Sequence, residues 1–221
     1  MENRFENDTV IHKKIPLILV GGGGHCKSCI EVIEATKRFE IIGILDKEIG
    51  GDVLGYPIIG NDDLIPDLAT KGYQFLITLG QIKSPDLRIK LFQFIKNSGG
   101  ELATITAPTA TVSKRANIGE GTIVMHGVFV NVEAKIGNNC TINTRSIIEH
   151  DVQIGNNCHI STNVTLNGEV IIGDNCFVGS GSVFHQCVEV CSDVIISANS
   201  LIHKSISVSG VYLGNPLRKF K

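Results

Sequence analysis

Residues 136–178 read IGNNCTINTRSIIEHDVQIGNNCHISTNVTLNGEVIIGDNCFV, and this stretch decides the fold. Every sixth residue in it is aliphatic, and the step of six continues along the chain in both directions. The full set of apolar positions is Val112, Ile118, Val124, Val130, Ile136, Ile142, Ile148, Ile154, Ile160, Leu166, Ile172, Val178, Phe184, Val190, Ile196, Ile202 and Val208. Because 43% of all residues are hydrophobic, such an unbroken series would arise by chance less than about once in a million.

The six-residue period fits neither an α-helix nor an ordinary strand, whose periods are about 3.6 and 2 residues. One inward aliphatic residue per six is typical of a parallel β-helix, in which three units complete a coil of about eighteen residues. At that spacing Cys140, Cys158 and Cys176 form a column, which we expect to be a stack of small apolar side chains about 4.8 Å apart. We expect contacts between successive coils to hold the core, and no loop to interrupt the coils.

The chain before residue 107 shows a different pattern, in which short apolar runs alternate with helical periodicity. Strands are expected at Ile15–Val20, Ile41–Leu45, Phe75–Leu79 and Leu102–Ile105. Helices are expected at Cys26–Phe39, at Asn61–Ala69 with Asn61 as the cap, and after Ser84, where Ser84 would cap and Pro85 would open the helix. The buried stripe of that last helix would be Leu87, Leu91, Phe94 and Ile95.

Strands that alternate with helices favour a small, Rossmann-like parallel sheet. The sequence therefore predicts a flexible polar leader at residues 1–14, an α/β domain at residues 15–106, and a β-helix with a C-terminal tail at residues 107–221.

Composition excludes several classes of protein. The 20 basic and 22 acidic residues give a net charge of −2, which argues against a nucleic-acid binder that depends on counterion release. The apolar run Ile15–Val20 is too short for a membrane span or the core of a signal peptide. Seven cysteines in a chain without an export signal favour reduced thiols and a cytoplasmic location.

Five features together resemble one family. They are the glycine loop VGGGGH at 20–25, Asp46 after the second strand, the six-residue array, the string IIEHD at 147–151 and GNPLRK at 214–219. The chain resembles the left-handed β-helix acyltransferases, and among them the bacterial sugar acetyltransferases typified by the PglD and NeuD proteins. This resemblance implies a homotrimer with active sites between neighbouring β-helices, acetyl-CoA as the co-substrate and no metal. The implied acceptor is the amino group of a UDP-, dTDP- or GDP-linked amino-deoxy sugar.

Histidine is the side chain best suited to accept a proton near neutral pH, and the chain has seven. His150 lies two places after the inward Ile148, so its side chain should point away from the core. The resemblance implies that His150 is the general base and that Asp151 orients its ring. Glu149 is a nearby competitor for that orienting role.

The resemblance also implies that the α/β domain binds the nucleotide sugar and that the β-helix binds acetyl-CoA, and it assigns residues to each. It implies that His159 hydrogen-bonds the thioester carbonyl or lies beside it, that the amide of Gly168 donates to the oxyanion, and that Ala198 and Pro216 border acetyl-CoA. Asn143 matches a polar position near the sugar. Lys204, Arg218 and Lys219 could contact the phosphates of CoA.

The glycine loop follows a strand and opens a helix, so its free N–H groups could bind an anion. Cys26 stands where a dinucleotide fingerprint would have its last glycine, so the motif alone is weak. The resemblance implies that Gly23, Gly24, His25 and Asp46 hold the nucleotide part of the sugar substrate. Many relatives have a second acid after the first, whereas Lys47 follows here.

Three other functions remain open. An O-acetyltransferase acting on sialic acid or a related free sugar would keep the fold and change the acceptor. A zinc lyase similar to the gamma-class carbonic anhydrases would need a histidine spacing that this chain lacks, and neither the stacked pair His185 and His203 nor the pair Cys26 and Cys29 supplies a full ligand set. A scaffold without enzymatic activity would bind no acetyl-CoA.

Overall fold

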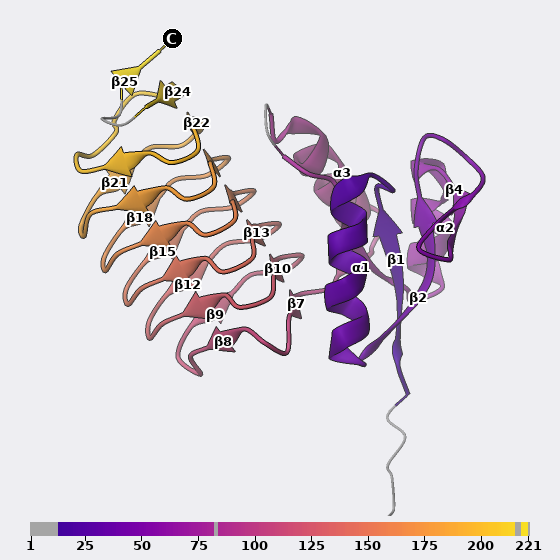
Figure 1. The fold of residues 1–221 in the computed structure, drawn as a ribbon. Coiled ribbons are helices and arrows are strands. Elements are labelled where there is room, and N and C mark those ends of the chain that lie inside the picture. Colours follow the sequence, from indigo (N-terminus) through magenta and orange to yellow (C-terminus); the bar gives the residue numbers. More distant parts are fainter. Residues whose placement is uncertain (1–12, 82–83, 215–217, 221) are drawn as a thin grey trace, which may run out of the picture.

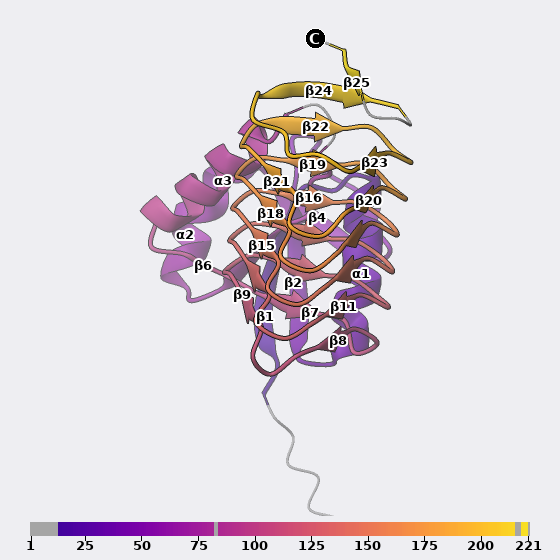
Figure 2. The ribbon, with the colours of Figure 1, turned by 90° about the vertical axis from the view of Figure 1, so that its left-hand side faces the viewer.

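The computed structural model describes residues 13–81, 84–214 and 218–220. It consists of an α/β layer structure beside a column of stacked triangular coils (Figure 1). In the view of Figure 2 the coils lie in front of the α/β part. The predicted combination of a small α/β domain and a left-handed parallel β-helix is confirmed.

A six-stranded sheet with the order β3-β4-β2-β1-β5-β6 forms the centre of the first part. Its strands are β1 (Ile15–Val20), β2 (Phe39–Leu45), β3 (Asp52–Val53), β4 (Tyr56–Gly60), β5 (Gln74–Ile77) and β6 (Glu101–Leu102). Neighbouring strands run parallel except in the β3–β4 hairpin. That hairpin is not predicted from the sequence, because its first strand has only two residues and Pro57 interrupts the second.

Helices cover both faces of this sheet. α1 (Gly24–Thr36) packs on one face, while a short 3-10 helix (Asp62–Leu64), α2 (Ile65–Thr70) and α3 (Asp86–Asn97) cover the other. The alternation of β1 explains this division, because Leu17 and Leu19 join the core under α1 whereas Ile18 and Val20 join the core under α2 and α3. The predicted cap is confirmed, since Asn61 Oδ1 accepts a hydrogen bond from the backbone N–H of Asp63 at 3.0 Å.

Two predicted helices differ in detail from the structure. The first ends at Thr36 and not at Phe39, because Lys37 takes a left-handed conformation (φ 57°) and Phe39 begins β2. The third begins at Asp86 with Pro85 at the N-cap, one residue later than predicted, although Ser84 Oγ still accepts from the N–H of Asp86 at 3.1 Å.

The predicted buried stripe of α3 was partly wrong. Leu87 and Phe94 are 45% and 39% exposed, and the buried residues are Arg88, Leu91 and Ile95. The helix is rotated so that a charged residue, Arg88, takes an inward position.

The predicted strand Leu102–Ile105 was also wrong. This stretch holds two strands in two different sheets, because β6 pairs with β5 whereas β7 (Ile105–Thr106) pairs with β10 of the β-helix. The chain passes from the α/β sheet into the first coil within these few residues.

Three sheets form the walls of the β-helix, and their neighbouring strands run parallel except for the antiparallel pair β24 and β25. The domain-facing wall contains β7, β10 (Ile123–Val124), β13 (Thr141–Ile142), β16 (His159–Ile160), β19 (Phe177–Val178), β22 (Val194–Ile196), β24 (Gly210–Leu213) and β25 (Arg218–Lys219). The second wall contains β8 (Thr111–Val112), β11 (Phe129–Val130), β14 (Ile147–Ile148), β17 (Thr165–Leu166), β20 (Val183–Phe184) and β23 (Leu201–Ile202). The third wall contains β9 (Asn117–Ile118), β12 (Lys135–Ile136), β15 (Gln153–Ile154), β18 (Ile171–Ile172) and β21 (Glu189–Val190).

Successive coils stack with an eighteen-residue register, as in the pairing of Ile142 with Ile160. The cysteine column is buried as predicted, with Cys140, Cys158 and Cys176 each at most 1% exposed. The expected step of six fails at its last position, because Val208 is 52% exposed. Ile206, which bridges to Val190, replaces it, so the final coil is sixteen residues long (206 − 190).

The two parts share a core. α1 packs between the α/β sheet and the domain-facing wall (Figure 1), where Cys29 and Ile30 join one apolar cluster with Ile105, Ile123 and Met125. The position of the helix N-terminus relative to the coils is therefore fixed by apolar packing.

Candidate active site

The histidine of the IIEHD string lies at the corner between the second and third walls. His150 follows β14, and its Nδ1 lies 2.9 Å from Oδ2 of Asp151. Asp151 has a left-handed backbone (φ 61°), which turns the chain at this corner. Glu149, the other carboxylate that the sequence left open, accepts a hydrogen bond from Nδ2 of Asn131 at 2.7 Å. Asp151 is thus the carboxylate that contacts the ring.

This contact sets the chemistry of the imidazole. The hydrogen bond that His150 donates to Asp151 raises the pKa of His150 above its usual 6.5, and the negative charges of Asp151, Glu149 and Glu169 act in the same direction. With the carboxylate accepting, Nδ1 carries the hydrogen and Nε2 is left as the free base. The ring can therefore take up one proton at Nε2.

Gly168 lies one coil further along, under the ring of His150. A Cβ at Gly168 would come within 2.6 Å of both Cε1 and Nε2 of His150. Within the described residues the N–H of Gly168 makes no hydrogen bond, whereas its carbonyl accepts from the N–H of Cys187 at 3.0 Å. A free backbone donor thus lies beside the basic nitrogen.

His159 lies elsewhere, on β16 of the domain-facing wall. It is 7% exposed, and its ring centroid lies 6.0 Å from that of His25 and 5.3 Å from that of Phe177. Burial lowers the pKa of His159 to about 3 and that of His25 to about 4. Both rings are consequently neutral at physiological pH.

The glycine loop is tied to the acid after β2. The N–H of Gly22 donates to Oδ2 of Asp46 at 2.6 Å, and this hydrogen bond lowers the pKa of Asp46. α1 begins at Gly24 with no side-chain cap and no acid in its first turn. No atom lies within 4 Å of the Cβ position of Gly23 or Gly24, so the helix N-terminus is open.

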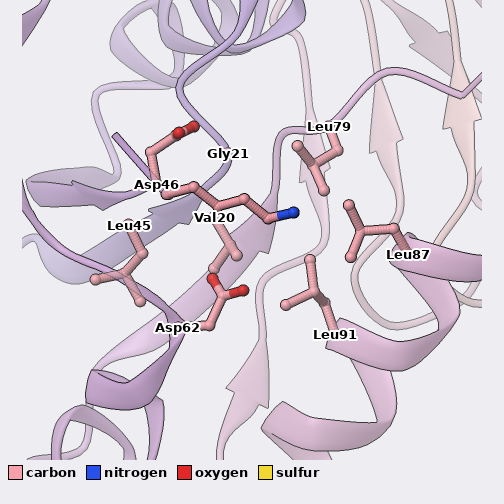
Figure 3. Close-up of a pocket in the computed structure, with 9 residues that line it drawn as sticks. Val20, Gly21, Leu45, Asp46, Asp62, Leu79, Leu87 and Leu91 are labelled. Carbon is pink, nitrogen blue, oxygen red and sulfur yellow. The ribbon is translucent and has the colours of Figure 1, made fainter. Parts of the chain in front are cut away.

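A cavity of about 190 Å³, here called the loop pocket, adjoins this loop (Figure 3). Its lining is Val20, Gly21, Leu45, Asp46, Lys47, Asp62, Leu79, Leu87 and Leu91. Leu79, Leu87 and Leu91 form an apolar side, and the carboxylates of Asp46 and Asp62 lie at the other edges. Of the four predicted nucleotide-binding residues, Asp46 lines the pocket, whereas Gly23, Gly24 and His25 are not among the described residues that line it.

One chain does not bring all predicted site residues together. Asn143 follows β13 and Ala198 follows β22, so both lie at the corner between the domain-facing and second walls. His150 lies at the opposite edge of the second wall, seven residues after Asn143 (150 − 143). The two corners are separated by the width of that wall, which is up to about 20 Å. His150, Asp151 and Gly168 thus lie at the corner opposite the domain-facing wall, whereas His25 of the glycine loop lies against that wall beside His159.

The remaining predicted positions are at the C-terminal end. Pro216 lies outside the described residues. Lys204 and Lys219 line a shallow pocket of about 250 Å³ together with His203 and Tyr212.

No three His, Cys, Asp or Glu side chains gather as a metal-ligand set in residues 13–81, 84–214 and 218–220. His185 and His203 stack with ring centroids 6.3 Å apart. Cys26 and Cys29 are buried in α1, and burial raises the pKa of both thiols, that of Cys29 to about 12. These thiols are therefore protonated at neutral pH. Within the described residues, no helix is long and apolar enough to cross a membrane.

Sequence reasoning missed Arg88, which is 3% exposed. Its guanidinium donates to the carbonyls of Ile77 (3.1 Å) and Leu79 (2.8 Å) and to both oxygens of Asn139 (3.0 and 2.9 Å). The available signal was its position three residues before Leu91 and seven before Ile95, on the inward face of an amphipathic helix.

Comparisons with known proteins agree with this architecture. Residues 16–93 match the PglD N-terminal domain, and residues 133–168 and 169–204 match the six-repeat bacterial transferase hexapeptide family. PerB from Caulobacter crescentus, solved in complex with CoA and GDP-perosamine, is 30% identical with a TM-score of 0.87, over 93% of this chain and 97% of that one.

Two further relatives extend the comparison. The acetyltransferase domain of PglB from Neisseria gonorrhoeae, in complex with acetyl coenzyme A, is 28% identical with a TM-score of 0.89, over 94% of this chain and all of that one. UDP-N-acetylbacillosamine N-acetyltransferase from Bacillus subtilis is 33% identical over 115 residues, which are 48% of this chain and half of the relative's length. The chain belongs to the family of bacterial sugar acetyltransferases in which a PglD N-terminal domain precedes a left-handed β-helix of hexapeptide repeats.

Proposed function

We propose that this protein is a homotrimeric N-acetyltransferase that transfers the acetyl group of acetyl-CoA to the amino group of a nucleotide-linked amino-deoxy sugar. The observation that carries the proposal is the corner at which His150, oriented by Asp151, lies against Gly168, whose N–H makes no hydrogen bond among the described residues. The relatives described as complexes with CoA and GDP-perosamine or with acetyl coenzyme A support the choice of substrates.

The reaction follows from these groups. The sugar amine attacks the thioester carbonyl carbon, a C–N bond forms, and Nε2 of His150 takes the proton that the nitrogen loses. The N–H of Gly168 donates to the oxygen that becomes negative. When the C–S bond breaks, the CoA thiolate leaves and takes the proton back from His150. Asp151 accepts from Nδ1 throughout and favours the imidazolium.

The α/β domain would hold the nucleotide. The open N-terminus of α1 suits a diphosphate, because its first N–H groups have no side-chain cap. The apolar side of the loop pocket suits the flat face of a base, and the ionised Asp46 can accept from its N–H groups or from a ribose hydroxyl. The neutral rings of His25 and His159 suit uncharged hydroxyl groups of the sugar.

A second copy of the chain would complete the site. The second wall presents Phe129, Ile147, Val183 and Leu201, each 36–38% exposed, in one outward column. Burying this column against a neighbouring coil would bring the His150 corner of one copy to the Asn143 and Ala198 corner of the next. Replacing Ile147 with Lys should convert the trimer to monomers in light scattering and abolish turnover. A monodisperse active monomer of the unchanged protein would refute this arrangement.

The substrate assignment is tested with a panel. UDP-, dTDP- and GDP-linked amino sugars and free sialic acid are each incubated with acetyl-CoA, and released thiol is measured. We expect turnover with one or more nucleotide-linked amino sugars, and a loss of about 10²- to 10⁴-fold in His150→Ala with an unchanged oligomer. Turnover only with free sialic acid would favour O-acetylation, and unchanged turnover in His150→Ala would exclude the proposed base.

A cytoplasmic location is part of this proposal. All seven cysteines, which lie within the described residues, are free thiols, and five of them are buried. Reduced cysteines are usual in cytosolic proteins.

A further inference from the structure

Arg88 carries a buried positive charge that no carboxylate neutralises. It is 3% exposed, and none of the ion pairs between described residues involves it. An isolated buried charge is costly unless it is well hydrogen-bonded. All four acceptors of this guanidinium are oxygens of neutral groups, and one of them, Oδ1 of Asn139, belongs to a longer series of hydrogen bonds.

This series, here called the asparagine ladder, runs along the corner between the third and domain-facing walls. Nδ2 of Asn139 donates to Oδ1 of Asn157 at 2.9 Å, Nδ2 of Asn157 donates to Oδ1 of Asn175 at 3.2 Å, and Nδ2 of Asn175 donates to Oδ1 of Asp193 at 3.0 Å. The four residues share a left-handed backbone, with φ between 54° and 62°. They therefore present equivalent atoms at every eighteenth residue.

The direction of the ladder is uniform. Every amide in it points its oxygen toward Arg88 and its NH₂ group toward Asp193, so the series begins at a cation and ends at a carboxylate. Hydrogen bonds aligned in this way polarise one another and strengthen each bond by roughly 10–30%. The charge at Arg88 is consequently compensated by aligned dipoles in place of a direct ion pair.

Arg88 also lies directly behind the loop pocket. Its Nη1 donates to the carbonyls of Ile77 and Leu79 at the end of β5, and Leu79 lines the pocket together with Leu87 and Leu91 of α3 (Figure 3). Its Nη2 donates to Asn139 on the β-helix. One side chain thus joins the pocket wall to a corner of the coil.

We propose that Arg88 is a positioning residue which, together with the asparagine ladder, fixes the loop pocket on the β-helix and so determines where a bound sugar meets the acetyl group. The inference rests on the proposed function only for the identity of what the pocket holds. The energetic coupling between Arg88 and the asparagine ladder can be measured without any enzymatic activity.

The coupling is tested by thermal melting of the unchanged protein and four variants. Glycine accepts a left-handed backbone without strain, so Asn157→Gly interrupts the ladder without touching Arg88. Asn163→Gly is the matched control, because Asn163 has the same φ of 57° but is exposed and its side chain makes no hydrogen bond among the described residues. We expect Asn157→Gly to lower Tm by about 4 °C more than the control.

The decreases in Tm caused by Arg88→Lys and Asn157→Gly should then be non-additive. The Tm of the double variant should fall by less than the sum of the two single decreases. Additive losses, or equal Tm values for Asn157→Gly and its control, would overturn the coupling. If Arg88→Lys does not fold, Asn139→Gly takes its place, because it removes one acceptor of Arg88 and keeps the backbone geometry.

The positioning role is tested by steady-state kinetics of Asn139→Gly on a substrate from the panel. We expect kcat to fall about tenfold or more through misplacement of the sugar, with KM for acetyl-CoA within about twofold of the unchanged protein. An unchanged kcat would overturn the role of Arg88. Absence of turnover in the unchanged protein on every panel member would refute the proposed function, while the melting cycle would still decide the coupling.

Discussion

The imidazole of His150 rests on the backbone of Gly168, so closely that a single methyl group at Gly168 would lie 2.6 Å from Cε1 and Nε2. Gly168 does not have a positive φ, so its backbone conformation is also accessible to alanine. The ring is the movable partner and would be displaced.

Gly168→Ala is therefore expected to lower kcat by about 10- to 100-fold, because the added methyl group displaces the base from its position against residue 168. Tm should change by less than about 4 °C, since the displaced ring is at the surface. The measurement is kcat by thiol release beside a melting curve. Full activity in Gly168→Ala would show that the ring position is irrelevant to turnover.

Asp151 should control the pH profile. The neutral imidazole is the base, so kcat/KM should rise with pH as His150 loses its proton, at a pKa above 6.5. In Asp151→Asn the carboxylate that favours the imidazolium is lost, so this limb should move to lower pH and kcat should fall by about tenfold or more. The equivalent Glu149→Gln variant should shift the limb less, because Glu149 is hydrogen-bonded to Asn131. A larger shift in Glu149→Gln would reverse the assignment.

Acid should destabilise the fold through His25 and His159. Their folded pKa values of about 4 and about 3 lie below the unfolded value of 6.5, so below pH 6.5 the unfolded chain binds more protons and stability falls as pH falls. At pH 5 each of these two rings should lower the free energy of unfolding by about 2 kcal/mol relative to pH 7. Denaturation in urea at the two pH values measures this loss.

The decrease in the free energy of unfolding between pH 7 and pH 5 should be about half as large in His159→Gln, because glutamine does not titrate. His185→Gln replaces an exposed histidine and serves as the control. An identical pH dependence in His159→Gln and the unchanged protein would contradict the neutral, buried state of this ring.

Asp46 should affect the nucleotide-linked substrate alone. Its carboxylate holds the N–H of Gly22 at 2.6 Å and lines the loop pocket. Asp46→Asn keeps an acceptor but removes the charge, so KM for the nucleotide sugar should rise about tenfold while KM for acetyl-CoA stays constant. Asp63→Asn is the control, because Asp63 lies in the 3-10 helix and is not among the described residues that line the pocket. A rise in KM for acetyl-CoA in Asp46→Asn would argue against a nucleotide-binding role.

Much of the fold was predictable because it is repetitive or local. The step of six identified the coils, since every unit must bury one aliphatic residue against its neighbours, and the cap at Asn61 follows from a local side-chain hydrogen bond. Errors arose where tertiary contacts override a local pattern. Helical spacing predicted that Leu87 and Phe94 would be buried, but both are exposed. α3 instead buries Arg88, because Asn139 of the β-helix supplies hydrogen-bond acceptors for it.

The sequence by itself determined the coil architecture, the exposure of His150 and the presence of a glycine loop before a helix, because each depends on residues close together in the chain. Only the tertiary structure decided which carboxylate contacts His150, which residue lies under its ring, and that His159 is buried beside His25. It also placed the His150 corner opposite the domain-facing wall, against which His25 of the glycine loop lies. The physical reason is that these relations join residues one or more coils apart, or on different domains, and their distances are set by stacking and not by the local pattern.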